Sequence, residues 1–391
     1  MRTFDFMSTY DYIIIGAGAS GLLLADAMVS DSFFKEKSIL ILEKSNKSTN
    51  DRTWCFWEEG KGRFDDITYR TWPKIQFRAA NLISEPKIAP YSYKMVRGID
   101  FYAHYQSKLQ NHANLTYRNE AVQQIVEKNT VVQVSGSEND YKGLHVFDSR
   151  FDYQQLMESS KYPVLQQHFL GWFVKTEKAV FNPEAATFMD FSIPQRGNTR
   201  FMYVLPFSET EALVEYTLFS RDVLEKAEYE GAISSYLDSY LKAGKYTITE
   251  VEKGNIPMTC FDFGARNTDR VIKIGIAGGW AKPSTGYTFY RSFKMANKLA
   301  QHLKQGKRLS RFSKKDRFWF YDLLLLDILN KHNHLGALIF EALFKKRRPQ
   351  LIFKFLDEGT SLVEDIYIMA APKPWPFIKA LLNRLFKLHG P

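Results

Sequence analysis

A glycine-rich turn near the N-terminus constrains the fold more than any other feature of this sequence. The stretch "DYIIIGAGASGLLLADAM" has a short apolar run, then Gly16, Gly18 and Gly21, and then apolar residues at helical spacing. Three such glycines between a strand and a helix allow a tight turn, close approach of the backbone to a pyrophosphate, and close helix–strand packing. We therefore predict a dinucleotide-binding βαβ unit, in which Gly16, Gly18, Ser20 and Gly21 contact the cofactor.

The next apolar segment completes this unit. "SILILEK" is typical of a second strand that ends at Glu43, where a carboxylate can accept a hydrogen bond from a ribose hydroxyl. Because strand, helix, second strand and terminal acid follow in order, a glycine-rich turn without a ligand is the weaker interpretation. The pattern permits NAD or FAD, and its position close to the N-terminus favours FAD.

A second glycine-rich turn occurs late in the chain. "RVIKIGIAGGWAKPSTGYTF" begins with an expected strand at 271–276 and leads into the helical spacing of "YRSFKMANKLAQHL". Backbone N–H groups at such a turn can hold the ribityl–phosphate arm and ring edge of a flavin. The alternative is an ordinary α/β turn without a ligand. The residues predicted to contact the flavin here are Gly278, Gly279, Pro283, Gly286 and Tyr287.

The composition indicates a full apolar core and an affinity for anionic surfaces. The 391 residues suffice for two or three domains, the formal net charge is +10, and 15% of the residues are aromatic. Cys55 and Cys260 lie far apart, which favours a reducing compartment. We expect neither a secretory signal nor a membrane-spanning helix. No zinc-finger, helix-turn-helix or RNA-binding signature accompanies the basic residues, so we predict a membrane surface, and no nucleic acid, as partner.

Several segments resemble one family over nearly the whole chain, the flavin-dependent lycopene cyclases. The segments are "DRTWCFWEE" (51–59), "YKMVRGIDFY" (93–102), "VFDSR" (146–150), "QQHFLGWFV" (166–174), "FMDFSIPQ" (188–195), "FMYVLPFSETEALVEYT" (201–217), "AGGWAKPSTGYTF" (277–289) and "FLDEGTS" (355–361). The family's usual Phe-Leu-Glu-Gly-Thr is "FLDEGT" here, so either Asp357 or Glu358 takes the position of its acid.

The resemblance implies a specific activity. It implies conversion of the linear psi ends of lycopene to beta-ionone rings, giving gamma- and then beta-carotene, as a redox-neutral isomerisation. It also implies reduced FAD as cofactor, with NAD(P)H as reductant, and lycopene and related linear carotenoids as substrates. Arg52, Thr53 and Trp54 fall where the family places flavin contacts.

The motif positions predict a discontinuous architecture. We expect residues 9–50, 95–150 and 265–310 to form a Rossmann-like FAD-binding domain, and 51–94 with 151–264 to form an antiparallel β-sheet substrate domain. "TRFMYVLPF" and "ALVEYTLF" predict a hairpin in the second domain. A helical region is expected from 311 to 391. By fold analogy, this α/β class with an interleaved sheet is like that of the flavin hydroxylases.

Ring closure needs a strong acid in a dry, apolar pocket. Within "ALVEYTLF", Leu213, Glu215 and Thr217 share one face of the expected strand, and a glutamate in an apolar run is costly unless it is paired or functional. An ion pair with a nearby arginine is the structural alternative. The resemblance places the family's essential acid on Glu215. Asp190 in "FMDF" is a second candidate acid, and a capping or pairing function suits it equally well.

The C-terminal segment predicts membrane contact. In "PWPFIKALLNRLFKLHGP", Ile378, Leu381, Leu382 and Leu385 form a stripe, Trp375 and Phe377 precede it, and Lys379, Arg384 and Lys387 add positive charge. We therefore expect an in-plane helix at 375–388 and a peripheral location at the cytoplasmic face of the membrane. For 316–344 we expect a helical subdomain that packs on the core.

Two other functions remain open at this stage. One is an FAD-dependent monooxygenase or prenyl reductase acting on a lipid, which would consume NADPH in proportion to product. The other is a membrane-associated flavin-binding protein without catalysis, against which an apolar setting for Glu215 argues. His332 and His334 lack the i, i+4 spacing of a helical metal site, and we predict no metal.

Overall fold

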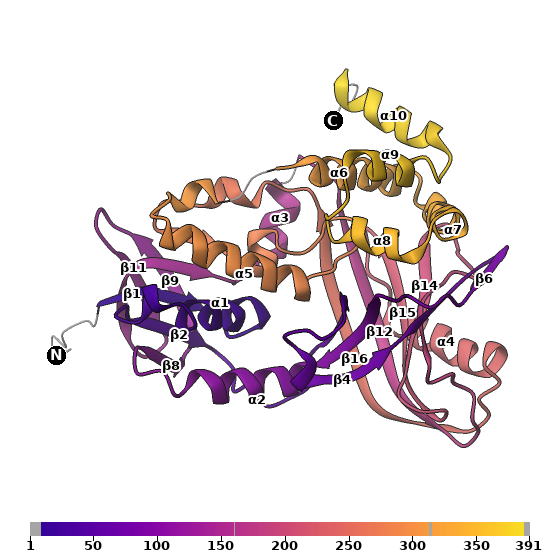
Figure 1. Cartoon of the computed structure of the whole chain (residues 1–391), viewed down its shortest axis with the longest axis horizontal. Coiled ribbons are helices and arrows are strands. Elements are labelled where there is room, and N and C mark those ends of the chain that lie inside the picture. The colour runs from indigo at the N-terminus through magenta and orange to yellow at the C-terminus, as the bar shows by residue number, and fades with distance from the viewer. Residues whose placement is uncertain (1–8, 160, 313–314, 387–391) are drawn as a thin grey trace.

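Two seven-stranded sheets, one three-stranded sheet and a helical C-terminal region make up the structure (Figure 1). The structure is a computed structural model that describes residues 9–159, 161–312 and 315–386. It confirms the mixed α/β class with parallel and antiparallel sheets. Among the described residues, no helix combines the length and apolarity needed to cross a membrane.

The first sheet is built around the N-terminal glycine-rich unit. Its strands lie in the order β8-β2-β1-β11-β10-β9, and β17 pairs with β11. The strands are β1 (Thr9–Ile15), β2 (Ile39–Glu43), β8 (Leu115–Asn119), β9 (Val122–Glu127), β10 (Val132–Gly136), β11 (Asp140–Asp148) and β17 (Val271–Lys273). All of them fall within the three segments predicted for the FAD-binding domain.

The apolar runs near the N-terminus form parallel strands that are buried on both faces of the sheet. β1 pairs in parallel with β2 and β11, and β2 pairs in parallel with β8. Ile14, Ile39 and Ile41 pack under the helices α1 (Ala19–Val29), α2 (Gly98–Leu109) and α5 (Phe289–Lys304). Their neighbours along each strand form a separate cluster on the opposite face. This two-sided burial is characteristic of parallel sheets.

The second sheet comes from the segments predicted for the substrate domain. Its order is β16-β12-β15-β14-β13-β5-β6. The strands are β5 (Lys74–Ala79), β6 (Leu82–Ser84), β12 (Val164–Thr176), β13 (Ala185–Asp190), β14 (Thr199–Pro206), β15 (Glu211–Ser220) and β16 (Tyr246–Thr259). The predicted hairpin is confirmed, because β14 and β15 pair antiparallel from Thr199–Phe219 to Pro206–Ala212.

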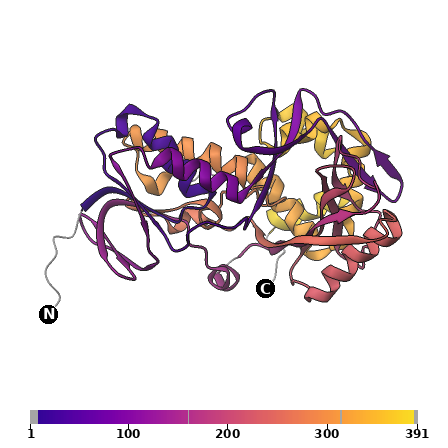
Figure 2. The ribbon, with the colours of Figure 1, turned by 90° about the horizontal axis from the view of Figure 1, so that it is seen from below.

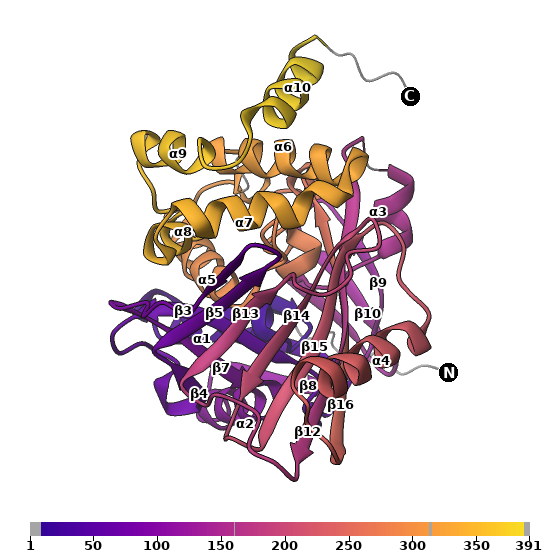
Figure 3. The same cartoon turned by 90° about the vertical axis from the view of Figure 1, so that its right-hand side faces the viewer.

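Different helices cover the two faces of this sheet (Figure 3). Leu213 and Phe219 belong to the face under the C-terminal helices, while Val214 and Tyr216 pack toward α4 (Lys226–Ser235) on the other side. The C-terminal helices are α6 (Arg317–Lys331), α7 (Gly336–Lys346), α8 (Pro349–Leu356), α9 (Leu362–Met369) and α10 (Pro374–Leu385). The helical region expected after residue 310 is therefore confirmed.

A small sheet joins the two large ones. It consists of β3 (Thr53–Glu59), β7 (Tyr91–Arg97) and β4 (Thr68–Trp72), with β7 in the centre. A short helix, α3 (Tyr153–Ser159), precedes β12. Figure 2 shows the indigo N-terminal strands at one end of the molecule and the yellow C-terminal helices at the other. The first and second sheets thus lie side by side along its length.

Candidate functional site

The loops that follow β1, β11 and β17 meet at one edge of the first sheet. These strands are parallel, so their carboxyl ends lie together. Gly16 has φ +98°, and a Cβ there would lie 2.1 Å from Ser149 Oγ. Gly275 has φ +62°, and a Cβ there would lie 2.5 Å from Ser20 Oγ. The two glycine-rich turns predicted from the sequence are therefore in contact, and Ser20 lies at their junction.

The start of α1 has the features of a pyrophosphate cradle. Gly18 is its N-cap residue, and no side chain in the described part of the chain caps the helix. A Cβ on Gly18 would meet no atom of the described residues within 4 Å, whereas one on Gly21 would lie 1.9 Å from Gly16 O. The open approach to uncapped N–H groups fits the phosphates of a dinucleotide. The residues present therefore fit the predicted cofactor.

Glu43 ties the first turn to the end of β2. Its Oε2 accepts a hydrogen bond from Ala17 N–H at 2.6 Å, and its Oε1 accepts from Ser45 N–H at 3.0 Å. The side chain is buried. The Ser45 hydroxyl also donates to Oε1 at 2.9 Å, so Oε2 is the oxygen that can accept a second bond. Its contact with a ribose hydroxyl stays a prediction.

The segment 277–289 needs its glycines for close approach. A Cβ on Gly278 would lie 2.2 Å from Lys273 O, and Gly279 adopts φ +72°. Gly286 has φ +68°, and a Cβ there would lie 2.2 Å from Gln167 Oε1 on β12. The segment therefore runs from the first sheet to the second, and it places Tyr287 and its neighbours at a cavity between them.

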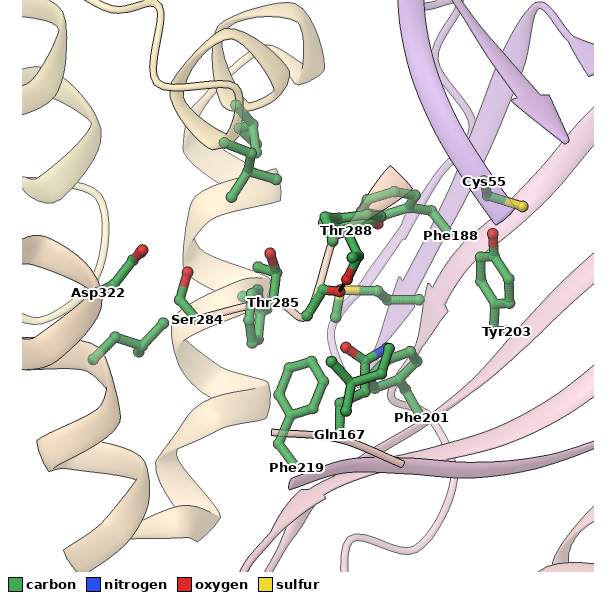
Figure 4. Close-up of a pocket in the computed structure, with 18 of the residues that line it drawn as sticks. Cys55, Gln167, Phe188, Phe201, Tyr203, Phe219, Ser284, Thr285, Thr288 and Asp322 are labelled. Atoms are coloured by element: carbon green, nitrogen blue, oxygen red, sulfur yellow. Dashed lines mark hydrogen bonds between the residues drawn. The ribbon is translucent and has the colours of Figure 1, made fainter. Parts of the chain in front are cut away.

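That cavity has a volume of about 290 Å³ and lies between the second sheet, the segment 284–289 and the C-terminal helices. Figure 4 shows Ser284 and Thr285 between Asp322 on the helical side and Phe201 and Tyr203 on the strand side. The predicted site residues that line it are Arg52, Thr53, Trp54, Glu215, Gly286 and Tyr287. The others are not part of its lining: Gly16, Gly18, Ser20, Gly21, Glu43, Asp190, Gly278, Gly279 and Pro283.

Glu215 is a buried carboxyl group in this cavity. It lies in the middle of β15 and is 8% exposed, and the Thr217 hydroxyl donates a hydrogen bond to its Oε1. No ion pair involves Glu215 among the described residues. Arg200, an arginine on the neighbouring strand β14, contacts Glu228 and the Tyr216 hydroxyl. Burial raises the pKa of Glu215 to about 8. The hydrogen bond from Thr217 lowers this pKa in part, and the nearby Glu252 raises it by a smaller amount. The group therefore holds its proton at neutral pH.

A second buried glutamate, Glu252 on β16, lines the same cavity. Thr53 donates to it twice, through its N–H at 2.9 Å and its hydroxyl at 2.5 Å. Gly171 on β12 is the register partner of both Glu215 and Glu252, so the two carboxyl groups flank it. Glu252 is not among the residues predicted from the sequence. In its strand, charged residues alternate with apolar ones, so no local pattern distinguishes Glu252 from a solvent-exposed residue at the edge of a sheet.

Phenol groups continue this row of polar residues. Tyr203 on β14 is the register partner of Glu215, and its hydroxyl lies 2.6 Å from the Tyr93 hydroxyl. Burial raises the pKa of Tyr93, Tyr203 and Tyr287. Burial also raises the pKa of the nearby Cys55 thiol. These groups are therefore neutral hydrogen-bonding partners at physiological pH.

Asp190, the second predicted acid, is not part of the cavity lining, and its catalytic function stays a prediction. It is completely buried and accepts hydrogen bonds from the Tyr236 hydroxyl at 2.8 Å and from Ser192 N–H at 2.9 Å, with Arg78 at 3.5 Å. The register of β13 shifts before Asp190, on both sides of the strand. This bulge turns the side chain toward Tyr236 and away from the face that carries Glu215. These contacts fit the capping or pairing function that the sequence equally allowed.

A buried ion-pair network connects the segment 277–289 to the C-terminal helices. Lys282 is 2% exposed, and its Nζ lies 3.0 Å from Asp322 on α6 and 3.4 Å from Glu358 after α8. Glu358 also binds Arg291, whereas Asp357 pairs with Lys294 at 3.3 Å. Of the two acids left open by the sequence, Glu358 is therefore the one in contact with the glycine-rich segment.

Comparisons with solved structures give the fold context. A geranylgeranyl bacteriochlorophyll reductase-like protein from Thermoplasma acidophilum aligns with a TM-score of 0.61 at 12% identity, over 95% of this chain and 98% of that one. A flavin-dependent brominase aligns with a TM-score of 0.59 at 14% identity, over 97% and 100%. A probable FAD-dependent monooxygenase from Pseudomonas aeruginosa aligns with a TM-score of 0.55 at 14% identity, over 90% and 100%. The chain therefore shares the fold of these three proteins.

Sequence comparisons give the family. A lycopene beta-cyclase from Paracoccus sp. (strain N81106 / MBIC 01143) is 27% identical over 141 residues. That match spans 34% of this chain and about a third, 35%, of the curated relative. Residues 11–382 match the profile of the family described as lycopene cyclase protein. The match covers nearly the whole described chain, and the protein therefore belongs to the lycopene cyclase family.

Proposed function

We propose that this protein is a lycopene beta-cyclase. It would convert the psi ends of lycopene to beta-ionone rings, through gamma- to beta-carotene, by acid-initiated, redox-neutral cyclisation. The observation that carries the proposal is Glu215, a proton-bearing carboxyl group in an apolar cavity between the glycine-rich segment and the C-terminal helices. A neutral acid in a dry pocket is what protonation of an alkene requires.

The cavity walls suit a cationic intermediate. Phe188, Phe201 and Phe219 project into the cavity, and aromatic faces stabilise a nearby positive charge. The Thr217 hydroxyl orients the Glu215 carboxyl group, which would protonate the terminal double bond. Few polar groups line the helical side, so few sites there would hold a water molecule that could quench the cation.

The chain also offers a place for FAD. The cradle at Gly18 and the turn around Ser20 would hold the pyrophosphate, and Arg52, Thr53 and Tyr287 would contact the flavin ring at the cavity. When bound, the reduced flavin would supply an electron-rich ring beside the cation without net electron transfer, and NAD(P)H would be its reductant.

Pigment analysis tests the proposed activity. Cells that make linear lycopene should accumulate beta-carotene when they express this protein, and lycopene should persist with Glu215→Gln. The competing function is an FAD-dependent monooxygenase or prenyl reductase acting on a lipid. It would consume NADPH in proportion to product, whereas a cyclase needs the nucleotide only to reduce its flavin. Stoichiometric NADPH consumption without rings would refute the cyclase.

We further propose peripheral attachment at the cytoplasmic face of a membrane through α9 and α10. Both helices present apolar side chains to the outside: Leu362, Val363, Ile366 and Tyr367 on α9, and Trp375, Ile378, Leu382, Leu385 and Phe386 at α10. The inner sides of the same region contribute Ile368, Met369, Pro372 and Phe377 to the cavity. A substrate dissolved in the bilayer would thus have a short apolar path to Glu215.

Some residues of the predicted membrane stripe have other positions. Leu381 packs in the cluster between α6 and α10. Arg384 binds the buried Asp327 at 2.7 Å, so it holds the helix to α6. Lys379 is exposed beside the apolar face, and Lys373 adds a second exposed cation. Lys387, at the end of the predicted stripe, lies outside the described residues.

A further inference from the structure

We propose that Glu252 is the base that removes the proton after ring closure, and that its position opposite Glu215 selects which double bond the new ring keeps. This inference rests on the proposed cyclase function. It assigns a second reacting group to the site.

The register of the second sheet places the two glutamates on either side of one glycine. Glu215 and Glu252 are each paired with Gly171, so they lie two strands apart in one row. With neighbouring strands about 4.8 Å apart, their Cα atoms are separated by about 10 Å. A Cβ on Gly171 would lie 2.8 Å from Leu213 Cδ1, so the Leu213 side chain packs over the glycine. Both carboxyl groups still line the same cavity, so a substrate end bound in it would lie against both of them.

The hydrogen bonds of the two groups differ in a way that separates acid from base. Glu215 accepts one bond, from a hydroxyl group. Glu252 accepts from both a backbone N–H and a hydroxyl of Thr53, and such donors favour the charged form. Burial raises the pKa of Glu252 above its ordinary value as well, and the bonds from Thr53 and then the charge of Arg52 oppose that rise only in part. Two carboxyl groups in unequal surroundings are a common arrangement of an acid with a base.

Other groups around Glu215 are poor candidates for the base. Cys55, Tyr93, Tyr203 and Tyr287 are neutral because burial raises the pKa of each. A neutral phenol or thiol accepts a proton far less readily than a carboxylate. Asp322 also lines the cavity, but it is paired with Lys282 at 3.0 Å. Glu252 is therefore the carboxylate placed to accept the proton.

The proposed steps balance without any redox partner. The O–H bond of Glu215 breaks, and the π electrons of the terminal double bond form the new C–H bond. The π electrons of the neighbouring double bond then close the ring through a new C–C bond and leave a tertiary cation. A C–H bond next to that cation breaks, its electrons form the ring double bond, and the proton goes to Glu252. One proton returns from Glu252 to Glu215 through water between turnovers.

The place of the base decides the product. The tertiary ring cation is flanked by a ring CH₂, by a methyl group and by the ring CH that bears the polyene. Loss of a proton from each gives a different isomer, and only the last gives the beta ring. A base held on the far side of Gly171 by Thr53 can reach one of these hydrogens more readily than the others.

The test compares Glu252→Gln with Glu252→Asp and with the control Glu250→Gln. Glu250 lies two residues away on the same strand, binds Arg97 at 3.4 Å, and is not part of the cavity lining. Each purified, FAD-loaded enzyme is incubated with lycopene vesicles and reductant, and both the rate and the ring isomers are measured. Glu252→Gln should lose roughly a hundredfold or more in rate and raise the share of non-beta rings. Glu252→Asp should recover part of the rate, and Glu250→Gln should match wild type.

The ring isomers separate a base from a structural anchor. A wild-type rate and isomer ratio in Glu252→Gln would overturn the inference. A second outcome would also overturn it: both Glu252→Gln and Thr53→Val lose FAD, and the residual product contains only beta rings. That result would mean that Glu252 only holds Thr53 in position for FAD binding. Absence of any ring product from the wild-type enzyme would instead refute the proposed cyclase function, which keeps the two failures distinct.

Discussion

Replacement of Glu215 by glutamine should abolish cyclisation and yet stabilise the protein at alkaline pH. Burial raises the pKa of Glu215 from its ordinary value of 4.5 to about 8, so the fold favours the neutral acid. Because the folded pKa lies above the unfolded one, this contribution is fully present below pH 4.5 and is lost as pH rises toward 8. Glutamine does not titrate, so the variant avoids that loss.

The size of the effect follows from the two pKa values. Each pH unit between them corresponds to ~1.36 kcal/mol, and the whole interval to about 5 kcal/mol. Between pH 5 and pH 8, the free energy of unfolding of Glu215→Gln should therefore rise by about 3 to 4 kcal/mol relative to wild type. All other titrations are shared by the two proteins and cancel in the difference.

Urea unfolding at pH 5 and pH 8 measures this difference directly. The control is Glu209→Gln, because Glu209 lies exposed in the turn between β14 and β15. Its stability relative to wild type should not change with pH. The free energy of unfolding of Glu215→Gln relative to wild type could instead differ by less than about 1 kcal/mol between pH 5 and pH 8. That result would refute the assignment of Glu215 as a buried neutral acid. Cyclisation by wild type should decline as the pH rises through about 8, because the acid then loses its proton.

Three further changes test other parts of the structure. Gly18→Val should abolish FAD binding, measured by flavin absorbance, and its urea midpoint should match that of FAD-free wild type, because a Cβ there meets no described atom within 4 Å. Val363→Glu with Ile366→Glu should move the protein from the membrane pellet to the supernatant with FAD retained, since these side chains are 78% and 66% exposed. Lys282→Met should lower the free energy of unfolding by about 3 to 5 kcal/mol, because Asp322 is left buried without its cation, and Asp322→Leu added to it should recover part of the loss.

Matched variants show what would contradict these expectations. Gly231→Val on α4 also meets open space and should keep FAD, so equal flavin in both valine variants would refute the cradle. Val251→Glu on β16 is a similar exposed change away from α9 and should still pellet. If the α9 double variant pelleted equally, the membrane surface would lie elsewhere. Wild-type stability of Lys282→Met would mean that Lys282 is not needed to neutralise Asp322.

The sequence predicted the features that depend on local patterns. The turn at Gly16 and Gly18 is encoded within one βαβ unit, and the β14–β15 hairpin follows from alternation on either side of a polar turn. The same alternation placed Glu215 on the opposite face from Val214 and Tyr216, as the packing confirms. These properties need only the spacing of residues along one strand or helix.

What the sequence could not predict depends on partners far along the chain. Glu252 shares a site with Glu215 only through the register of both strands with Gly171. Asp190 leaves the cavity because of a bulge, and a one-residue shift in a strand moves a side chain to the other face. In the sequence, Lys282 is one cation within a glycine-rich segment, and no local pattern indicates that it is buried. It is buried because α6, which carries Asp322, packs over it.

The partners of Lys282 have a consequence for the order of events during synthesis. A ribosome makes residue 282 well before residue 358, and a lysine cannot be buried cheaply without its counter-charges. The first sheet can form while the chain is still growing, but the loop that carries Lys282 should close only after Glu358 has left the exit tunnel. We therefore expect nascent chains stalled before that point to lack tightly held flavin. Tight binding of flavin would then indicate that translation of the C-terminal helices is nearly complete.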